Sequence, residues 1–231
     1  MDILFFGAHP DDVEIACAGT ILKYMDMGKQ IGIIDLTAGE MGTRGSAESR
    51  KEEVKAASKV LGINIRENLG LPDAFIDSAQ ETQMIVIDAI RKHRPKIVIA
   101  PAIRDRHPDH GNSAKLVSEA CFKSGLVKIK TDIKAWRPNA VYNFTQDRYI
   151  EPDFVIDISS YIDKKMEAIL CYKSQFFQPD SKEPETPISG ENFQDYIKMR
   201  AVQLGRPINA KYAEGYTVER PIGIEDITTL L

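Results

Sequence analysis

A short apolar run near the beginning of the chain ends abruptly in a group of polar side chains, and this feature constrains the fold most. Residues 3–8 have the pattern of a buried strand. The polar residues that follow at once are His9, Asp11, Asp12 and Glu14. In an open α/β sheet, ligands bind where a strand passes into its helix. The run therefore predicts an α/β sheet with a binding site at this junction.

The residues after the apolar run predict a helix that brings an imidazole and a carboxylate together. Pro10 cannot extend a central strand, but its fixed φ suits the first turn of a helix. Residues three apart on a helix share a face, so His9 and Asp12 can converge on one point. Asp11 faces a neighbouring direction. This arrangement is half of a metal site with a second carboxylate available as a base.

Apolar segments alternate with helical patterns over the first hundred residues. We expect strands at 3–8, 30–37, 63–69 and 96–100, and helices at 12–27, 47–61 and 80–93. Such alternation implies a parallel sheet with right-handed crossovers. The sequence therefore predicts an α/β, Rossmann-like fold with a mostly parallel sheet and helices on both faces. No G-x-G-x-x-G follows the first strand, which argues against a dinucleotide site.

The remainder of the chain is expected to complete the same domain. We expect helices at 112–124, 161–172 and 191–204, strands at 138–145 and 153–158, and a loop at 178–190. The segment 211–216 is expected to be ordered, because it combines aromatic residues with glycine. We predict one domain over residues 1–231, with a core at about 1–125 and a C-terminal part at about 138–231 that completes the site.

A second group of polar residues follows the fourth expected strand, and it contains two more histidines. His107, Asp109 and His110 lie here, so three of the four histidines occur at strand-to-helix junctions. A catalytic zinc takes three protein ligands and leaves a position for water. His9, Asp12 and either His107 or His110 would supply such a set. The residues alone do not decide between the two histidines.

The chemistry of such a metal site needs further groups, and the sequence supplies them. A hydrolytic reaction needs a base near the water and a group that protonates the leaving amine. Asp11 and the remaining histidine are suitable, and Asp109 could set the tautomer of a histidine. Three glycines between residues 38 and 45, together with Arg50, could hold a polar or anionic substrate, because guanidinium binds carboxylate in a bidentate manner.

Bulk composition excludes several classes of partner. The formal net charge is -4 and the isoelectric point about 5.7, so nucleic acid and anionic membrane are not expected as partners. The apolar run at 3–8 is too short for a signal peptide, and no run of roughly 18 apolar residues exists. Cys17, Cys121 and Cys171 form no C-x-x-C pair. We therefore expect reduced thiols and a cytoplasmic protein.

The two polar motifs together resemble a known enzyme family. Residues 8–14 (AHPDDVE) and residues 107–110 (HPDH) are similar to the motifs of the PIG-L/LmbE-like family of zinc-dependent N-acetylglucosaminyl deacetylases. Residues 37–45, 68–73, 172–176 and 212–215 resemble one branch of that family, the deacetylases of bacillithiol biosynthesis, which act on N-acetylglucosaminyl-malate. The resemblance extends over the whole chain and implies the same α/β fold and a homo-oligomer, either a trimer or a hexamer.

Roles for individual residues follow from this resemblance. It implies His9, Asp12 and His110 as metal ligands and Asp11 as general base. It implies His107 as the cationic partner of the tetrahedral intermediate, with Asp109 tuning it. The residues that it implies for substrate binding are Arg50, Glu14, Asp73, Arg106 and Tyr196, the last as a candidate for the tyrosine at the oxyanion.

Alternatives remain open at this stage. The metal is either zinc or iron(II), because a His₂Asp set suits both. The substrate is N-acetylglucosaminyl-malate, a simple or chitobiose-type N-acetylglucosamine sugar, or a conjugate of the thiol. The alternative from a different functional class is a non-catalytic sugar-binding module with the same fold.

Overall fold

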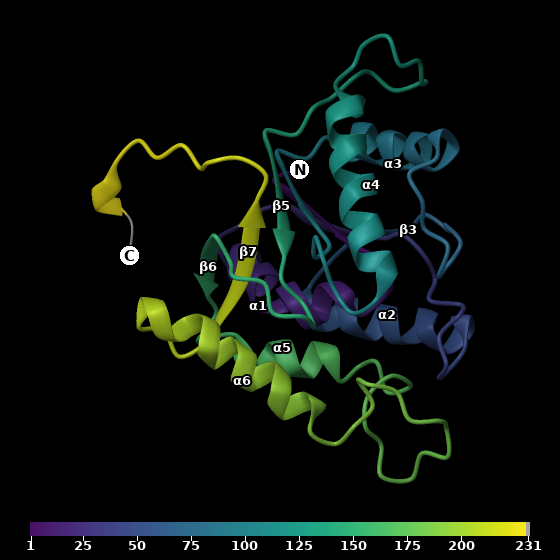
Figure 1. The fold of residues 1–231 in the computed structure, drawn as a ribbon, viewed down its shortest axis with the longest axis vertical. Helices are drawn as coiled ribbons and strands as arrows, with labels where there is room; N and C mark the ends of the chain where they lie inside the picture. The colour runs from purple at the N-terminus through teal and green to yellow at the C-terminus, as the bar shows by residue number, and fades with distance from the viewer. Residues whose placement is uncertain (230–231) are drawn as a thin grey trace.

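The computed structural model of the protein describes residues 1–229, which fold around a single seven-stranded sheet (Figure 1). The strand order is β3-β2-β1-β4-β5-β7-β6. The strands are β1 (Ile3–Gly7), β2 (Ile31–Asp35), β3 (Ile65–Asn68), β4 (Ile97–Ala100), β5 (Ala140–Phe144), β6 (Phe154–Asp157) and β7 (Ala213–Val218). The helices are α1 (Asp12–Asp26), α2 (Ala47–Leu61), α3 (Gln80–His93), α4 (Pro108–Ser124), α5 (Ile162–Ile169) and α6 (Phe193–Gly205), with short 3-10 helices at Arg206–Ile208 and Ile227–Thr229.

Strands β1 to β5 pair in parallel, whereas β7 pairs antiparallel with both β5 and β6. The chain order reverses between β1 and β4, which lie next to each other in the middle of the sheet. Loops that leave the carboxyl ends of these two strands diverge to opposite sides. This is the position in an open α/β sheet where a crevice for ligands forms.

The sheet buries both of its faces, as near-continuous apolar strands require. Leu4 and Phe6 of β1 pack toward α3 and α4 on one face. The alternate residues Ile3 and Phe5 pack toward α1 and α5 on the other. Helix α6 packs against β7 at the antiparallel edge. Figure 1 shows α3 and α4 together on one side and α1, α2 and α5 on the other.

The predicted α/β class is confirmed, and most expected elements lie within a few residues of their predicted positions. Helix α4 begins earlier than expected, at Pro108, because proline suits the first helical turn and His107 caps the helix by accepting from the backbone N–H of Asp109. Strand β7 was expected only as an ordered segment. The charged residue Glu214 interrupts the apolar pattern that would predict a strand here. In the structure its side chain is buried because it pairs with Lys165.

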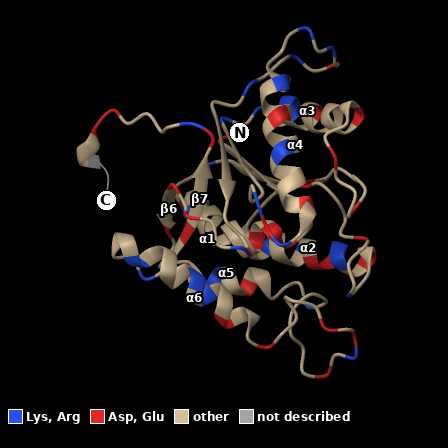
Figure 2. Ribbon diagram, in the orientation of Figure 1, with Lys and Arg blue, Asp and Glu red and all other residues tan. Residues whose placement is uncertain are grey.

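Figure 2 shows that basic and acidic residues are interspersed along α2, α3 and α4. Among residues 1–229, no helix has the length and apolar character needed to span a membrane.

Candidate active site

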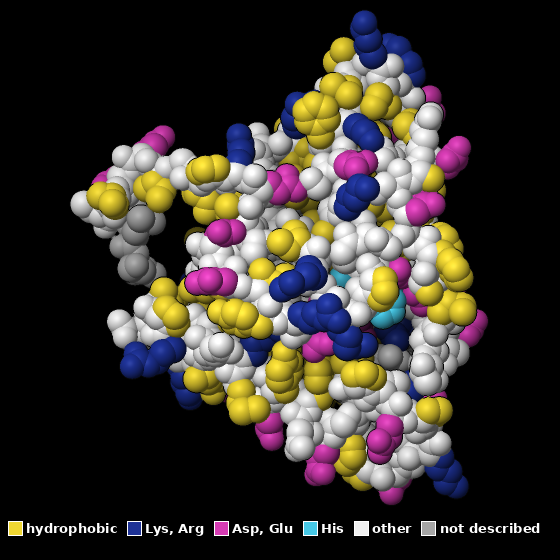
Figure 3. All heavy atoms as spheres, viewed as in Figure 1, with side chains coloured by type: hydrophobic (Ala, Val, Ile, Leu, Met, Phe, Trp, Pro, Cys, Tyr) yellow, Lys and Arg dark blue, Asp and Glu magenta, His cyan; other side chains and the backbone are white. Residues whose placement is uncertain are grey.

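A pocket with a volume of about 340 Å³ opens at the carboxyl ends of β1 and β4. The loops after β1, β2, β3 and β4 form one side of it. Residues 145–147, 185–188 and helix α6 form the other side, so both halves of the chain contribute. On the face shown in Figure 3, histidine side chains reach the surface beside a group of Lys and Arg side chains. Both polar groups predicted from the sequence contribute to this pocket, which is lined by His9, Asp11 and Asp12 of the first group and by His107 and His110 of the second.

The junction between β1 and α1 holds its first carboxylate in an unusual backbone conformation. Asp11 is the N-cap of α1 and has φ 114°, in the left-handed region that non-glycine residues seldom adopt. Such a conformation costs on the order of 1–3 kcal/mol and tends to occur at functional sites. Asp12 is the first helical residue, and its Oδ2 accepts the backbone N–H of His9 at 2.9 Å. The strained turn therefore places two adjacent carboxylates at the floor of the pocket.

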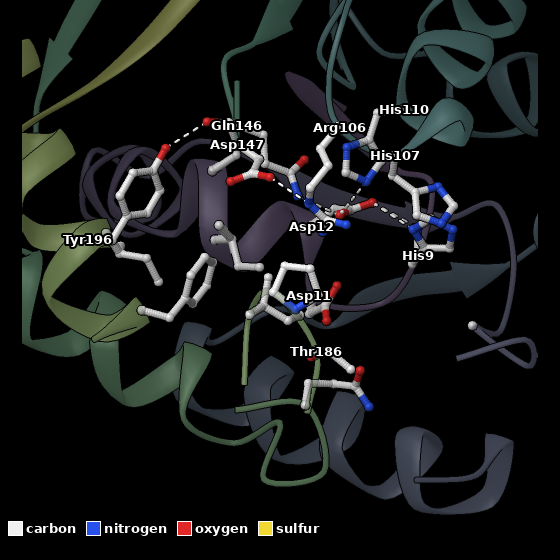
Figure 4. A pocket seen from close by; sticks show the side chains of 18 of the residues that line it. His9, Asp11, Asp12, Arg106, His107, His110, Gln146, Asp147, Thr186 and Tyr196 are labelled. Carbon is white, nitrogen blue, oxygen red and sulfur yellow. Dashed lines mark hydrogen bonds and ion pairs between the residues drawn. The ribbon is translucent and has the colours of Figure 1, made fainter. Parts of the chain in front are cut away.

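Two imidazoles contact the carboxylate of Asp12, and the ring of His107 lies beside both of them (Figure 4). His9 Nδ1 lies 3.5 Å from Asp12 Oδ2, and His110 Nε2 lies 3.2 Å from Asp12 Oδ1. Ring nitrogens of His9, His107 and His110 come within 4.8 Å of one another. A second triad with the same spacing consists of His9, Asp73 and Asp109. The structure thus brings together all the residues that the sequence proposed as metal ligands.

Two of these histidines are anchored by a carboxylate on the nitrogen that faces away from Asp12. His110 Nδ1 lies 2.7 Å from Asp105, and His9 Nε2 lies 3.0 Å from Asp73. Histidines that bind metals usually donate their other N–H to a carboxylate in this way. In the neutral form, each imidazole then directs a lone pair toward Asp12.

The ionisation of the clustered side chains is compatible with a bound cation. Burial opposes protonation of His9, but the carboxylates of Asp109, Asp12 and Asp73 hold its pKa well above the ordinary value. Burial likewise opposes protonation of His110, whose pKa is nevertheless raised to about 9 by Asp12 and Asp105. Two imidazoles that take up protons at neutral pH supply the same charge as one divalent ion. Lone pairs that converge on a buried carboxylate make a donor set suited to zinc or iron(II).

His107 differs from the other two histidines. Its Nδ1 accepts the backbone N–H of Asp109 at 3.3 Å, so its neutral form carries the hydrogen on Nε2. Burial lowers its pKa, and the nearby His9 and His110 lower it further. The Asp109 carboxylate acts on His107 through its charge, which raises the pKa of His107 against these effects, and its direct contacts are with other groups. That carboxylate accepts from the backbone N–H of Ala74 and lies 3.4 Å from His9, because the first turn of α4 directs it there.

Asp11 and Arg50 form a second buried pair beside the cluster. Arg50 Nη1 donates to the Pro10 carbonyl at 2.6 Å and lies 3.4 Å from Asp11 Oδ2. Burial raises the pKa of Asp11 to about 7, against the opposing charge of Arg50. Within residues 1–229, Nη2 of Arg50 has no hydrogen bond. Gly39 and Gly42 approach this guanidinium closely, so a side chain at either position would contact it.

The residues predicted to bind substrate divide into two groups. Arg106 and Tyr196 line the pocket, and each contacts Asp147: Arg106 Nε lies 2.7 Å from its carboxylate, and the Tyr196 hydroxyl donates to its carbonyl at 2.6 Å. Asp73 also lines the pocket, where it contacts His9. Glu14 does not line it. The helical turn of α1 directs this side chain inward, where it is fully buried and paired with Arg66.

Several residues of the site were not singled out from the sequence. Asp105 lies within the second polar group, so its contact with His110 could have been considered. Gln146 donates to Asp12 Oδ1 at 2.7 Å from the loop after β5, and no sequence signal indicates this contact. Lys165 and Glu214 pair at 2.6 Å in the pocket wall, and their separation along the chain conceals the pairing.

Comparison with known proteins shows which family this chain resembles. The model of the PIG-L family, described as GlcNAc-PI de-N-acetylase, matches residues 4–121, about half of the chain. The diacetylchitobiose deacetylase of Thermococcus kodakarensis is 29% identical over 92% of this chain and 81% of its own length. A probable N-acetyl-alpha-D-glucosaminyl L-malate deacetylase 2 of Bacillus anthracis is 29% identical over 75% of this chain and 81% of its own length.

Two further comparisons extend over nearly the whole chain. The crystal structure of the conserved protein TT1542 from Thermus thermophilus has a TM-score of 0.90 and 32% identity, and the match covers 98% of each chain. A 4-oxalmesaconate hydratase of Pseudomonas putida is 26% identical over 95% of this chain and 84% of its own length, so the fold also serves another reaction. The family match covers both β1 and the HPDH motif. The chain therefore belongs to the PIG-L family of metal-dependent deacetylases.

Proposed function

We propose that the protein removes the acetyl group from N-acetylglucosaminyl-malate, yielding acetate and the free amine. The observation that carries this proposal is the placement of Asp12 between two histidines, each anchored by its own carboxylate, with Asp11 and His107 in the same pocket. This set contains each group that hydrolysis of an acetamide requires.

His9, Asp12 and His110 would hold the metal ion through His9 Nδ1, His110 Nε2 and the carboxylate. A bound zinc or iron(II) lowers the pKa of water and polarises a carbonyl. His107 is left out of this set, because its Nδ1 already accepts a backbone N–H. Its Nε2–H remains available to donate a hydrogen bond in the pocket.

Asp11 is the proposed general base. Its carboxylate is buried beside Asp12, and a pKa raised to about 7 lets it accept a proton near neutral pH. Water attacks the acetamide carbon and transfers a proton to Asp11. In its imidazolium form, His107 stabilises the developing oxyanion through Nε2–H and transfers this proton to the leaving nitrogen as the C–N bond breaks, which leaves a neutral imidazole. The water thereby supplies the oxygen of acetate, and the amine leaves neutral or protonated.

Two arginines of the pocket, Arg50 and Arg106, favour a substrate whose aglycone is anionic. Both arginines line the pocket: Arg50 is buried, and its Nη2 has no hydrogen bond within residues 1–229, whereas the side chain of Arg106 is 40% exposed. Guanidinium groups bind carboxylates in a bidentate manner, and malate offers carboxylates. The second candidate substrate is diacetylchitobiose, which is favoured by the similarity to the Thermococcus enzyme over 92% of this chain.

The test is release of free amine from N-acetylglucosaminyl-malate, diacetylchitobiose and N-acetylglucosamine by purified protein. We expect turnover that chelator abolishes and zinc restores, and that is fastest with the malate conjugate. A preference for diacetylchitobiose would retain the deacetylase and replace the substrate. If the protein binds one metal per chain and releases no amine from any acetamido sugar, the proposal is overturned. A hydratase activity would then be tested next.

A matched pair of variants tests the role of His107. His107→Gln removes the proposed proton donor, and we expect kcat to fall about 10²–10⁴-fold with metal still bound. His93→Gln is the same substitution at a histidine outside the pocket, where it pairs with Glu67, and kcat is expected to stay within about twofold. Equal activity of both variants would exclude His107 as the acid.

A further inference from the structure

One buried carboxylate, Asp105, connects the proposed metal site to the opposite wall of the pocket. Its side chain is fully buried in the loop between β4 and α4. Oδ2 lies 2.7 Å from His110 Nδ1 and accepts the backbone N–H of Asp147 at 3.2 Å. Oδ1 accepts the backbone N–H groups of Arg106 and Arg148 at 2.8 and 2.6 Å. Both oxygens are therefore fully engaged.

These contacts fix the hydrogen on His110. Three backbone N–H groups donate to Asp105 and stabilise its ionised form, which accepts hydrogen bonds but cannot donate. His110 must therefore carry a hydrogen on Nδ1, and its Nε2 keeps a lone pair in the neutral form. That Nε2 lies 3.2 Å from Asp12, where the metal ion is proposed to bind.

The same carboxylate also holds the segment after β5. Through the N–H groups of Asp147 and Arg148, Asp105 sets the position of residues 145–148. This segment directs the amide of Gln146 to Asp12 and the carbonyl of Asp147 to the Tyr196 hydroxyl on α6. The side chain of Asp105 thus aligns the proposed ligand His110, the carboxylate of Asp12 and helix α6, which forms the far wall of the pocket.

We propose that Asp105 is the positioning residue that commits His110 to bind the metal through Nε2 and that fixes residues 145–148 against the metal site. This inference rests on the proposed metal set, but it is independent of the substrate. Replacement by asparagine preserves the size of the side chain. Its amide N–H donates toward His110 Nδ1, so the neutral imidazole must move its hydrogen to Nε2 and loses the lone pair.

The experiment measures zinc affinity by competition with a chelating indicator, without substrate, for the wild type, Asp105→Asn and Asp157→Asn. Asp157 is a matched control, because its carboxylate also accepts a backbone N–H, that of Ser159, but lies outside the pocket lining. We expect Asp105→Asn to weaken zinc binding about 10–100-fold and Asp157→Asn to leave it within about twofold. Zinc affinity of Asp105→Asn within threefold of the wild type would overturn the proposal.

A second measurement is made on the wild type and does not require Asp105→Asn to fold. Selective ¹⁵N labelling of the four histidines of the wild type reports the hydrogen on each ring nitrogen in the zinc-loaded protein. We expect a hydrogen on Nδ1 and zinc on Nε2 of His110, with the signal assigned by its loss in His110→Gln. Zinc on Nδ1, or no zinc on this ring, would also overturn the role of Asp105. Failure of the deacetylation assay alone would leave both readouts unchanged.

Discussion

Replacement of Asp11 by asparagine separates the activity of this site from its stability. Burial raises the pKa of Asp11 from 3.8 to about 7 in the folded, metal-free protein. At about 1.4 kcal/mol for each pH unit, the ionised form is therefore destabilising by about 4 kcal/mol. The folded pKa lies above the unfolded one, so this loss of stability begins as pH rises above 3.8 and is complete above about 7. Asparagine resembles the protonated carboxyl and avoids the loss.

The assay is urea denaturation of chelator-treated wild type and Asp11→Asn at pH 5 and pH 8. We expect the free energy of unfolding of the variant to exceed that of the wild type by about 4 kcal/mol at pH 8 and by less at pH 5. Asparagine tolerates the left-handed backbone at φ 114°, so the turn itself is preserved. The zinc-loaded variant is expected to lose activity by orders of magnitude, because an amide cannot accept the proton.

Two results would refute this reasoning. Equal stability of the two proteins at pH 8 would show that the ionised carboxylate is not destabilised by its burial. Normal turnover by the zinc-loaded variant would remove Asp11 from the role of base, whatever its stability. Zinc content, measured in the same samples, distinguishes loss of the base from loss of the metal.

Three further perturbations test other parts of the site. Lys165→Met leaves Glu214 buried without its cation, and we expect a loss of about 3–5 kcal/mol in urea denaturation that a second change, Glu214→Gln, partly restores. Arg106→Gln is expected to raise KM for the malate conjugate about tenfold, roughly one charged hydrogen bond, with KM for diacetylchitobiose unchanged. Gly39→Ala forces a side chain into φ 68° at 3.3 Å from Arg50, and we expect a loss of about 1–2 kcal/mol by denaturation, whereas equal stability would show that the loop relaxes freely.

The parts of the site that sequence patterns predicted are those fixed by local structure. The helix that starts at Asp12 and the β4–α4 junction at Pro108 each depend on neighbouring residues in the chain. A parallel sheet then brings the carboxyl ends of its strands to one edge, which places His9 and His110 at the same edge. Their contact depends in addition on β1 and β4 being neighbours in the sheet. The choice of His110 over His107 as a ligand required the family resemblance. The structure supplies a physical reason, since only His110 has Asp105 on its Nδ1.

The contacts that the sequence did not predict join segments far apart in the chain. Glu14 lies within the first polar group and was expected at the substrate. It is two positions after Asp12 on α1, so its side chain points to the opposite side of the helix, to Arg66 in the interior. The partner is an ordinary arginine in β3, and nothing near it in the sequence marks it. Gln146 reaches Asp12 across the pocket by the same kind of long-range packing. Pairing of this kind depends on how strands are ordered, which periodicity does not determine.

The instability expected of Asp11 and the proposed chemistry have a common origin. The cluster surrounds its histidines with more carboxylates than nearby cations can balance, and protons on His9 and His110 offset part of the excess in the metal-free protein. A divalent ion can replace those protons, and burial raises the pKa of Asp11 beside them to about 7 in the metal-free protein. Such a carboxylate accepts a proton from water more readily than an ordinary aspartate, whose pKa is too low. The strained turn and the burial that destabilise the empty site are therefore the features that give Asp11 the properties of a base.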